Sequence, residues 1–68
     1  MARVWVSIED RAPTGTDPIV GVYGSVKSAI AGTLAAIGRD ATVEKDGVEI
    51  VITLRGKKYY INQYFVRT

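Results

Sequence analysis

The chain has 68 residues, a formal net charge of +2 and a hydrophobic content of 47%, so it can form one small domain, residues 1–68. A domain of this size buries only about 60% of the surface that its unfolded chain exposes, so contacts with a partner could add to its stability. The sequence contains no cysteine and no histidine. Disulfides, thiolate metal sites and histidine-based catalysis are therefore excluded.

The first residues are Met-Ala-Arg followed by a short apolar run. This run is too short for a signal peptide or a membrane-spanning helix. We therefore expect a cytoplasmic protein that makes no contact with a membrane.

The first strand is predicted over residues 3–8, where apolar and polar side chains alternate. The alternation places Val4, Val6 and Ile8 on one face and leaves Trp5 on the more polar one. Trp5 then either covers a sheet edge or the following loop, or contacts a partner, because aromatic side chains are enriched at interfaces.

Residues 9–18 contain two prolines, one glycine and few apolar side chains, which is typical of a loop. Such a long connection is either a solvated loop or a binding loop. Residues 19–23 are predicted to form a second strand, antiparallel to the first.

The only convincing helix is predicted between Ser25 and Gly38. Ser25 is a favourable N-cap residue, and Gly38 allows the chain to leave the helix with a positive φ. Between them, apolar residues recur at helical spacing and form a stripe that should pack on the sheet: Val26, Ala29, Ile30, Thr33, Leu34 and Ile37.

A second side of this helix carries only small residues, with Ser28, Ala31, Gly32 and Ala35 as its main members. Glycine inside a helix costs about 1 kcal/mol relative to alanine. Since small residues permit close approach of another backbone, we expect this side to contact another polypeptide, either a foreign protein or a second copy related by two-fold symmetry.

Two further strands, residues 41–45 and 48–54, flank Asp46-Gly47, a strong hairpin signal. If these two residues form the loop, Val43 lies opposite Ile50. A last strand over residues 57–66 should return through Arg55-Gly56, which places Ile52 opposite Tyr59 and Ile50 opposite Ile61.

These elements predict an α+β fold with the order β-β-α-β-β-β, in which one helix covers one face of an antiparallel sheet of about five strands. The helix-facing side should collect Val43, Val48, Ile50, Ile52, Leu54, Tyr59, Ile61 and Phe65. The opposite side should collect Glu44, Glu49, Val51, Thr53, Lys58, Tyr60, Asn62, Tyr64 and Val66.

Catalysis is not expected, because no acid–base pair stands out. Glu44, Asp46 and Glu49 near the hairpin tip could hold a divalent cation weakly, but acidic residues are common at solvated tips. The segment Gly21-Val22-Tyr23-Gly24 lacks the further glycines and the lysine of a phosphate-binding loop. We therefore expect no enzyme activity, no metal and no cofactor.

The last strand is the better candidate for binding. Lys58, Tyr60, Asn62 and Tyr64 alternate on one face, and Arg67 follows them. Aromatic rings beside cations can bind nucleic acid, since bases stack on rings and cations meet phosphates. The same residues could instead bind protein or have a structural role only. Glu44 and Glu49 share this face and would repel phosphates.

Gly21-Val22-Tyr23-Gly24-Ser25, followed by Ala29, resembles a pattern in small phage and prophage proteins of unknown function. The resemblance covers about residues 3–37. Small size, the absence of cysteine and histidine, and a single α+β layer are also similar to phage-encoded inhibitors of host defence, including anti-CRISPR proteins. The resemblance implies a compact, non-enzymatic protein that works by occupying a surface.

Two functions follow as expectations. The first is an anti-CRISPR-like protein that acts in the cytoplasm of a host cell, where it binds a host protein or ribonucleoprotein complex and blocks or modulates it. The alternative is a small nucleic-acid-binding module that uses the last strand.

Overall fold

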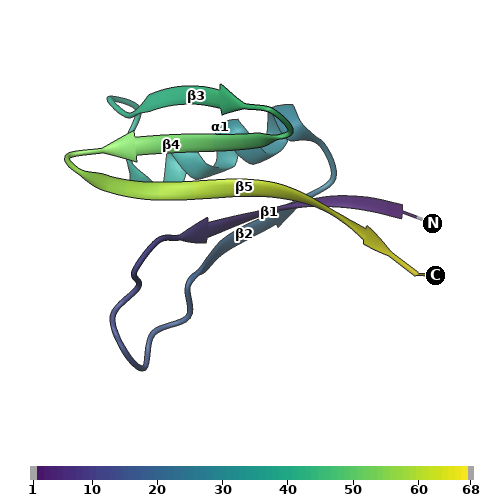
Figure 1. Ribbon diagram of the computed structural model, residues 1–68, viewed down its shortest axis with the longest axis horizontal. Coiled ribbons are helices and arrows are strands. Elements are labelled where there is room, and N and C mark those ends of the chain that lie inside the picture. Colours follow the sequence, from purple (N-terminus) through teal and green to yellow (C-terminus); the bar gives the residue numbers. More distant parts are fainter. Residues whose placement is uncertain (1, 68) are drawn as a thin grey trace.

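The computed structural model describes residues 2–67, which form one open sheet and one helix (Figure 1). The observed order β-β-α-β-β-β confirms the predicted fold class. The elements are β1 (Ala2–Glu9), β2 (Ile19–Tyr23), α1 (Val26–Ile37), β3 (Thr42–Asp46), β4 (Glu49–Leu54) and β5 (Lys57–Val66).

The strands lie in the order β2-β1-β5-β4-β3, and every neighbouring pair is antiparallel. Helix α1 connects the two edge strands, β2 and β3, and therefore has to cross one face of the sheet. Figure 1 views the molecule from the other face, with α1 behind the strands. Among residues 2–67, no helix combines the length and the apolar character needed to cross a membrane.

Helix α1 begins and ends as the sequence predicts. The Ser25 side chain accepts a hydrogen bond from the Ser28 backbone N–H at 3.1 Å, which satisfies a free donor of the first turn. At the other end, the Gly38 N–H donates to the Leu34 carbonyl at 2.8 Å. Gly38 has φ +129°, a conformation that favours glycine because it has no side chain.

The core lies between α1 and the central strands. Its fully or almost fully buried side chains are Ala29, Ile50, Ile52, Tyr59 and Ile61. Ile30 and Leu34 pack against this cluster but stay partly exposed. Within α1, only Ala29 and Thr33 are fully buried, so fewer helix side chains are buried than the predicted apolar stripe contains.

Strand β1 turns its polar residues toward the helix. Ser7 pairs with Ile61 of β5, is fully buried, and accepts a 2.8 Å hydrogen bond from the hydroxyl of Thr33, also fully buried. Trp5 shares this face and packs, half-buried, against the core. A small side chain suits the position because α1 passes close to β1 there.

The β3–β4 turn corrects one expected register. Its two loop residues are Gly47, with φ +63°, and Val48, so Asp46 lies opposite Glu49 and Val43 lies opposite Ile52. The observed β3–β4 register thus differs from the predicted one by two residues. Because side chains alternate with a period of two, this shift leaves each side chain of the two strands on its predicted face. Val48, predicted to be a core residue, is in the turn and 91% exposed.

The β4–β5 register agrees with the prediction, with Ile52 opposite Tyr59 and Ile50 opposite Ile61. Phe65, however, is 65% exposed instead of buried. It pairs with Arg3 of β1 near the end of β5, beyond the β5 residues that pair with β4. The Arg3 guanidinium lies 5.9 Å from the centroid of the Phe65 ring.

The ring of Tyr23 lies between two glycines. A Cβ atom at Gly21 would stand 2.4 Å from the Tyr23 hydroxyl, and one at Gly32 would stand 2.3 Å from Cε1 of the same ring. Both distances are too short for a real contact. Any larger residue at position 21 or 32 would therefore force the Tyr23 ring to move. The Tyr23 ring therefore explains why glycine occupies position 32, and contact with a second polypeptide is not needed to explain it.

Candidate interaction surface

The face of the sheet opposite α1, here called the open face, is covered by no element of residues 2–67. The registers define its cross-strand rows. One row runs across the whole sheet and contains Ile19, Ile8, Tyr60, Val51 and Glu44. Beside it lie Val22, Val6 and Asn62, and then Val4 and Tyr64.

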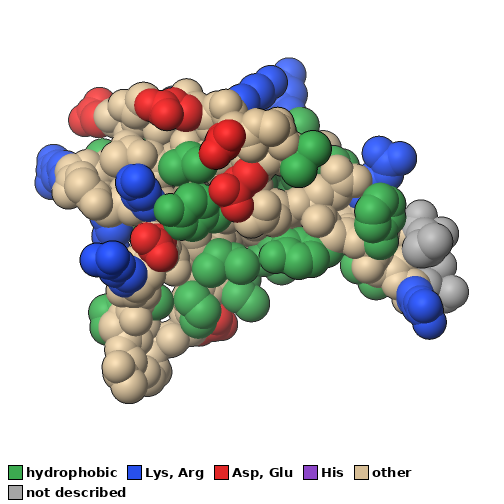
Figure 2. Space-filling view, in the orientation of Figure 1, with side chains coloured by type: hydrophobic (Ala, Val, Ile, Leu, Met, Phe, Trp, Pro, Cys, Tyr) green, Lys and Arg blue, Asp and Glu red, His purple; other side chains and the backbone are tan. Residues whose placement is uncertain are grey.

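Most of the open face over β2, β1 and β5 is apolar. We call this region the apolar patch: Val4, Val6, Ile8, Ile19, Val22, Tyr60, Tyr64 and Val66. Its outer members are well exposed, with Val22 at 59%, Ile19 at 49% and Tyr64 at 45%. Figure 2 shows hydrophobic side chains gathered on this face. Contiguous exposed apolar surface is uncommon on soluble monomers and indicates an interaction site.

The part of the open face over β3 and β4 is acidic. Glu44, Asp46 and Glu49 line a hollow there together with Lys45, Val51, Thr53, Lys58 and Tyr60. Figure 2 shows acidic side chains beside the hydrophobic ones. These three acidic residues, Glu44, Asp46 and Glu49, lie beside the apolar patch, and we call them the acidic border.

The structure brings four of the predicted binding residues together. Lys58, Tyr60, Asn62 and Tyr64 all lie on the open face, with Lys58 and Tyr64 exposed and the other two half-buried. Arg67 is exposed and follows the end of β5.

Trp5 does not join this group. It lies on the helix side of the sheet and packs against the core, so it is separated from the open face by the sheet itself.

On the predicted small-residue side of α1, Ser28, Ala31 and Ala35 are exposed. Gly32 faces the Tyr23 ring of β2. This side of the helix is therefore directed partly toward β2 and partly toward solvent.

The sequence reasoning missed the side chains of β1 that complete the apolar patch. Val4, Val6 and Ile8 form the more apolar set of β1, which normally marks the core face. Only the small size of Ser7, matched by Thr33 on the helix, could have indicated the reverse orientation.

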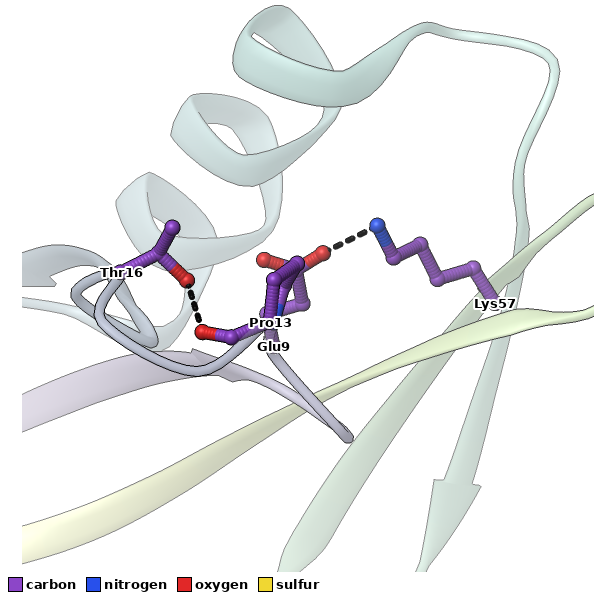
Figure 3. Close-up of polar contacts among 4 residues, drawn as sticks. All are labelled: Glu9, Pro13, Thr16 and Lys57. Atoms are coloured by element: carbon purple, nitrogen blue, oxygen red, sulfur yellow. Dashed lines mark hydrogen bonds and ion pairs between the residues drawn. The ribbon is translucent and has the colours of Figure 1, made fainter.

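A second hollow lies at the β4–β5 turn and is lined by Asp10, Arg11, Gly56, Lys57, Lys58 and Tyr60. At its margin, Lys57 forms an ion pair with Glu9 at the end of β1 (Figure 3). The hydrogen bond and the charge of Glu9 raise the pKa of Lys57 above its ordinary value.

The loop between β1 and β2 is ordered by local hydrogen bonds. The Thr16 hydroxyl donates to the Pro13 carbonyl at 2.6 Å (Figure 3), and the Ile19 N–H donates to the Asp17 carboxylate at 3.0 Å. Within residues 2–67, no group of three or more Asp, Glu, His or Cys side chains is arranged to hold a metal ion.

Comparison with known proteins identifies no relative of the chain: no protein-family model matches it, and neither a curated protein nor a solved structure is significantly similar to it.

Proposed function

We propose that the chain is a non-enzymatic binding domain whose open face docks on another protein and thereby blocks or modulates that protein. The observation that carries this proposal is the apolar patch. Val22, Ile19 and Tyr64 expose about half of their surface on a face that no element of residues 2–67 covers. Burying such side chains gives about 25 cal/mol per Å² of apolar surface, which is a strong drive for association.

The acidic border indicates the chemistry of the partner. Glu44, Asp46 and Glu49 stand next to Tyr60 on the same face. A partner that inserts apolar side chains into the patch and places lysine or arginine side chains over the border would match both regions. The resemblance to small phage-encoded inhibitors supports a partner in the host cell, such as a protein or ribonucleoprotein complex.

The proposal is tested by comparing which proteins the tagged chain retains from a host lysate. The test variant is Tyr64→Ala combined with Val4→Ser, which removes two side chains paired across β1 and β5. The control is Ala31→Ser, a change on the exposed side of α1. A protein retained by the wild type and the control but lost by the test variant supports docking on the open face. If the two variants and the wild type retain the same proteins, the open face is not the binding surface.

Nucleic-acid binding by the last strand is the second candidate, favoured by Lys58, Tyr60, Asn62 and Tyr64 on one face. Affinity for mixed-sequence DNA and RNA should be measured over a salt series, because a protein that neutralises phosphates weakens steeply as salt rises. Strong, salt-sensitive binding by the wild type would favour this candidate over protein docking.

A further inference from the structure

The two edges of the sheet differ in how they are protected. On β3, the edge strand carries Glu44, Lys45 and Asp46, and charged side chains on an edge oppose pairing with another chain. On β2, the sequence Ile-Val-Gly-Val-Tyr contains no charge and no proline. The pairing of β2 with β1 shifts register between Ser7 and Ile8, so β2 is irregular at Val20. From Gly21 to Tyr23, one side of the β2 backbone is an uncharged row of hydrogen-bonding groups that no strand of residues 2–67 pairs with.

At the beginning of β2, part of the backbone hydrogen-bonding capacity is already used within the chain. The Ile19 N–H is bonded to the Asp17 carboxylate, and Pro18, which has no N–H, precedes it. From Val20 to Tyr23, however, no comparable hydrogen bond from a side chain to the backbone occurs in the described residues. The segment available for pairing is thus the centre and the end of β2.

From this edge we propose that the chain forms a two-fold dimer in which β2 pairs antiparallel with β2 of a second copy, giving one continuous ten-stranded sheet. Antiparallel pairing centred on Val22 places Val22 opposite Val22 of the second copy on the open face, and Gly21 opposite Tyr23 of the second copy on the helix side, so each side chain keeps the face that it has in the monomer. Pairs of β-branched and aromatic side chains across strands are favourable. No like charges meet, because β2 has none.

A second copy fits this edge better than a repeated head-to-tail contact. Pairing of β2 with β3 of another copy would leave free edges at both ends and produce an open fibre, and the charges of β3 oppose it. Two-fold pairing of β2 leaves only the protected β3 edges at the ends of the larger sheet. It also joins the apolar patches of the two copies, since Val22 and Ile19 lie at the margin of each.

The contact is small. A standard interface buries about 800 Å² per partner, and pairing over part of a five-residue strand buries less. The dimer should therefore dissociate on dilution. Sedimentation of the wild type over a wide concentration range should show a reversible monomer–dimer equilibrium, and a protein that stays monomeric at about millimolar concentration overturns the proposal.

Three lysine substitutions locate the contact. Val22→Lys introduces a charge at the β2 edge and should abolish the dimer. Val43→Lys, the same change on the β3 edge, should leave it intact, and so should Tyr64→Lys, which lies on the open face away from β2. If Tyr64→Lys also gives a monomer, the copies associate through the open face and the edge proposal fails, while the proposed docking function is unaffected.

Hydrogen exchange provides the readout at the backbone. Amides of Val20–Tyr23 that face away from β1 should exchange more slowly at high protein concentration than at low concentration. Amides of β3 should not change, because that edge stays free. Equal protection of β2 at both concentrations, with a dimer present, would contradict strand pairing.

Discussion

The contact of Tyr23 with Gly32 gives a direct test of how closely the helix and the sheet approach each other. By helix propensity alone, Gly32→Ala should stabilise the protein by about 1 kcal/mol. The new methyl group, however, would stand 2.3 Å from the Tyr23 ring. Overpacking of this kind costs about 1–3 kcal/mol, so we expect chemical denaturation to show unchanged or lower stability.

The control is a double-mutant cycle. In a Tyr23→Val background the ring is absent, and Gly32→Ala should then stabilise the helix as propensity predicts. If Gly32→Ala raises the stability of the wild type by the same amount as in the Tyr23→Val background, the ring does not determine the choice of glycine.

Ser7 and Thr33 form the buried polar pair between β1 and α1, with a 2.8 Å hydrogen bond between their hydroxyls. Ser7→Ala leaves the Thr33 hydroxyl buried without this partner, which costs about 1–3 kcal/mol. Replacing both residues, as Ser7→Ala with Thr33→Val, removes both polar groups. The double variant should therefore be more stable in thermal or chemical denaturation than Ser7→Ala alone, and a double variant that is less stable would refute this role of the pair.

At the scale of elements, the orientation of β1 is tested with two isoleucines. Ile52 of β4 is fully buried under α1, so Ile52→Ala should cost about 2–5 kcal/mol of unfolding free energy. Ile8 of β1 is half-buried on the open face, so Ile8→Ala should cost clearly less. Equal losses measured by denaturant unfolding would place Ile8 in the core and contradict the observed orientation.

The elements themselves were predictable from local signals. The Ser25 and Gly38 caps define α1, Asp46-Gly47 indicates the β3–β4 hairpin, and the β4–β5 register follows from Arg55-Gly56. The exact β3–β4 register was wrong because glycine occupies the first turn position, which moves Val48 into the turn.

The face of β1 that packs on the helix was not predictable from alternation. Which face is buried depends on how closely α1 approaches, and that distance is determined by Ser7, Gly21 and Gly32, which are far apart in sequence. Only part of the candidate site could therefore be predicted from the sequence. Its β5 residues were found, whereas Val4, Val6 and Ile8 were placed together on one face of β1 but were not linked to the β5 residues.

The ion pair between Lys57 and Glu9 joins the beginning of β5 to the end of β1, and it predicts a pH effect. Because the folded state raises the pKa of Lys57, the pair stabilises the fold while lysine is protonated in both states. That stabilisation is lost as the pH rises through the raised pKa, above the ordinary lysine value of about 10.4.

The wild type should therefore lose stability relative to Lys57→Gln between about pH 10 and pH 12, measured as the difference between their melting temperatures. Lys58→Gln is the control, since Lys58 forms no ion pair in the described residues. A difference between wild type and Lys57→Gln that stays constant over this pH range would show that the pair does not contribute.

At the scale of the whole molecule, the distribution of charge separates protein docking from nucleic-acid binding. Tyr60 and Tyr64 of β5 share the open face with Glu44, Asp46 and Glu49, and these carboxylates repel phosphates at close range. We therefore expect the wild type to bind mixed-sequence DNA and RNA weakly, despite its net charge of +2.

Reversal of the acidic border should create the affinity that the wild type lacks. The variant Glu44→Lys with Glu49→Lys keeps the exposed rings and replaces two repulsive charges by attractive ones, on side chains that are exposed or half-buried. Its affinity for single-stranded DNA should exceed that of the wild type by at least about tenfold at low salt and decline steeply as salt is added. The control is Ala36→Lys with Asp40→Lys, two exposed positions in and just after α1, which adds positive charge away from the open face. If this control gains the same affinity, net charge alone governs binding; if the wild type already binds as tightly as the double variant, the carboxylates do not protect the open face, and nucleic acid becomes the better candidate for its ligand.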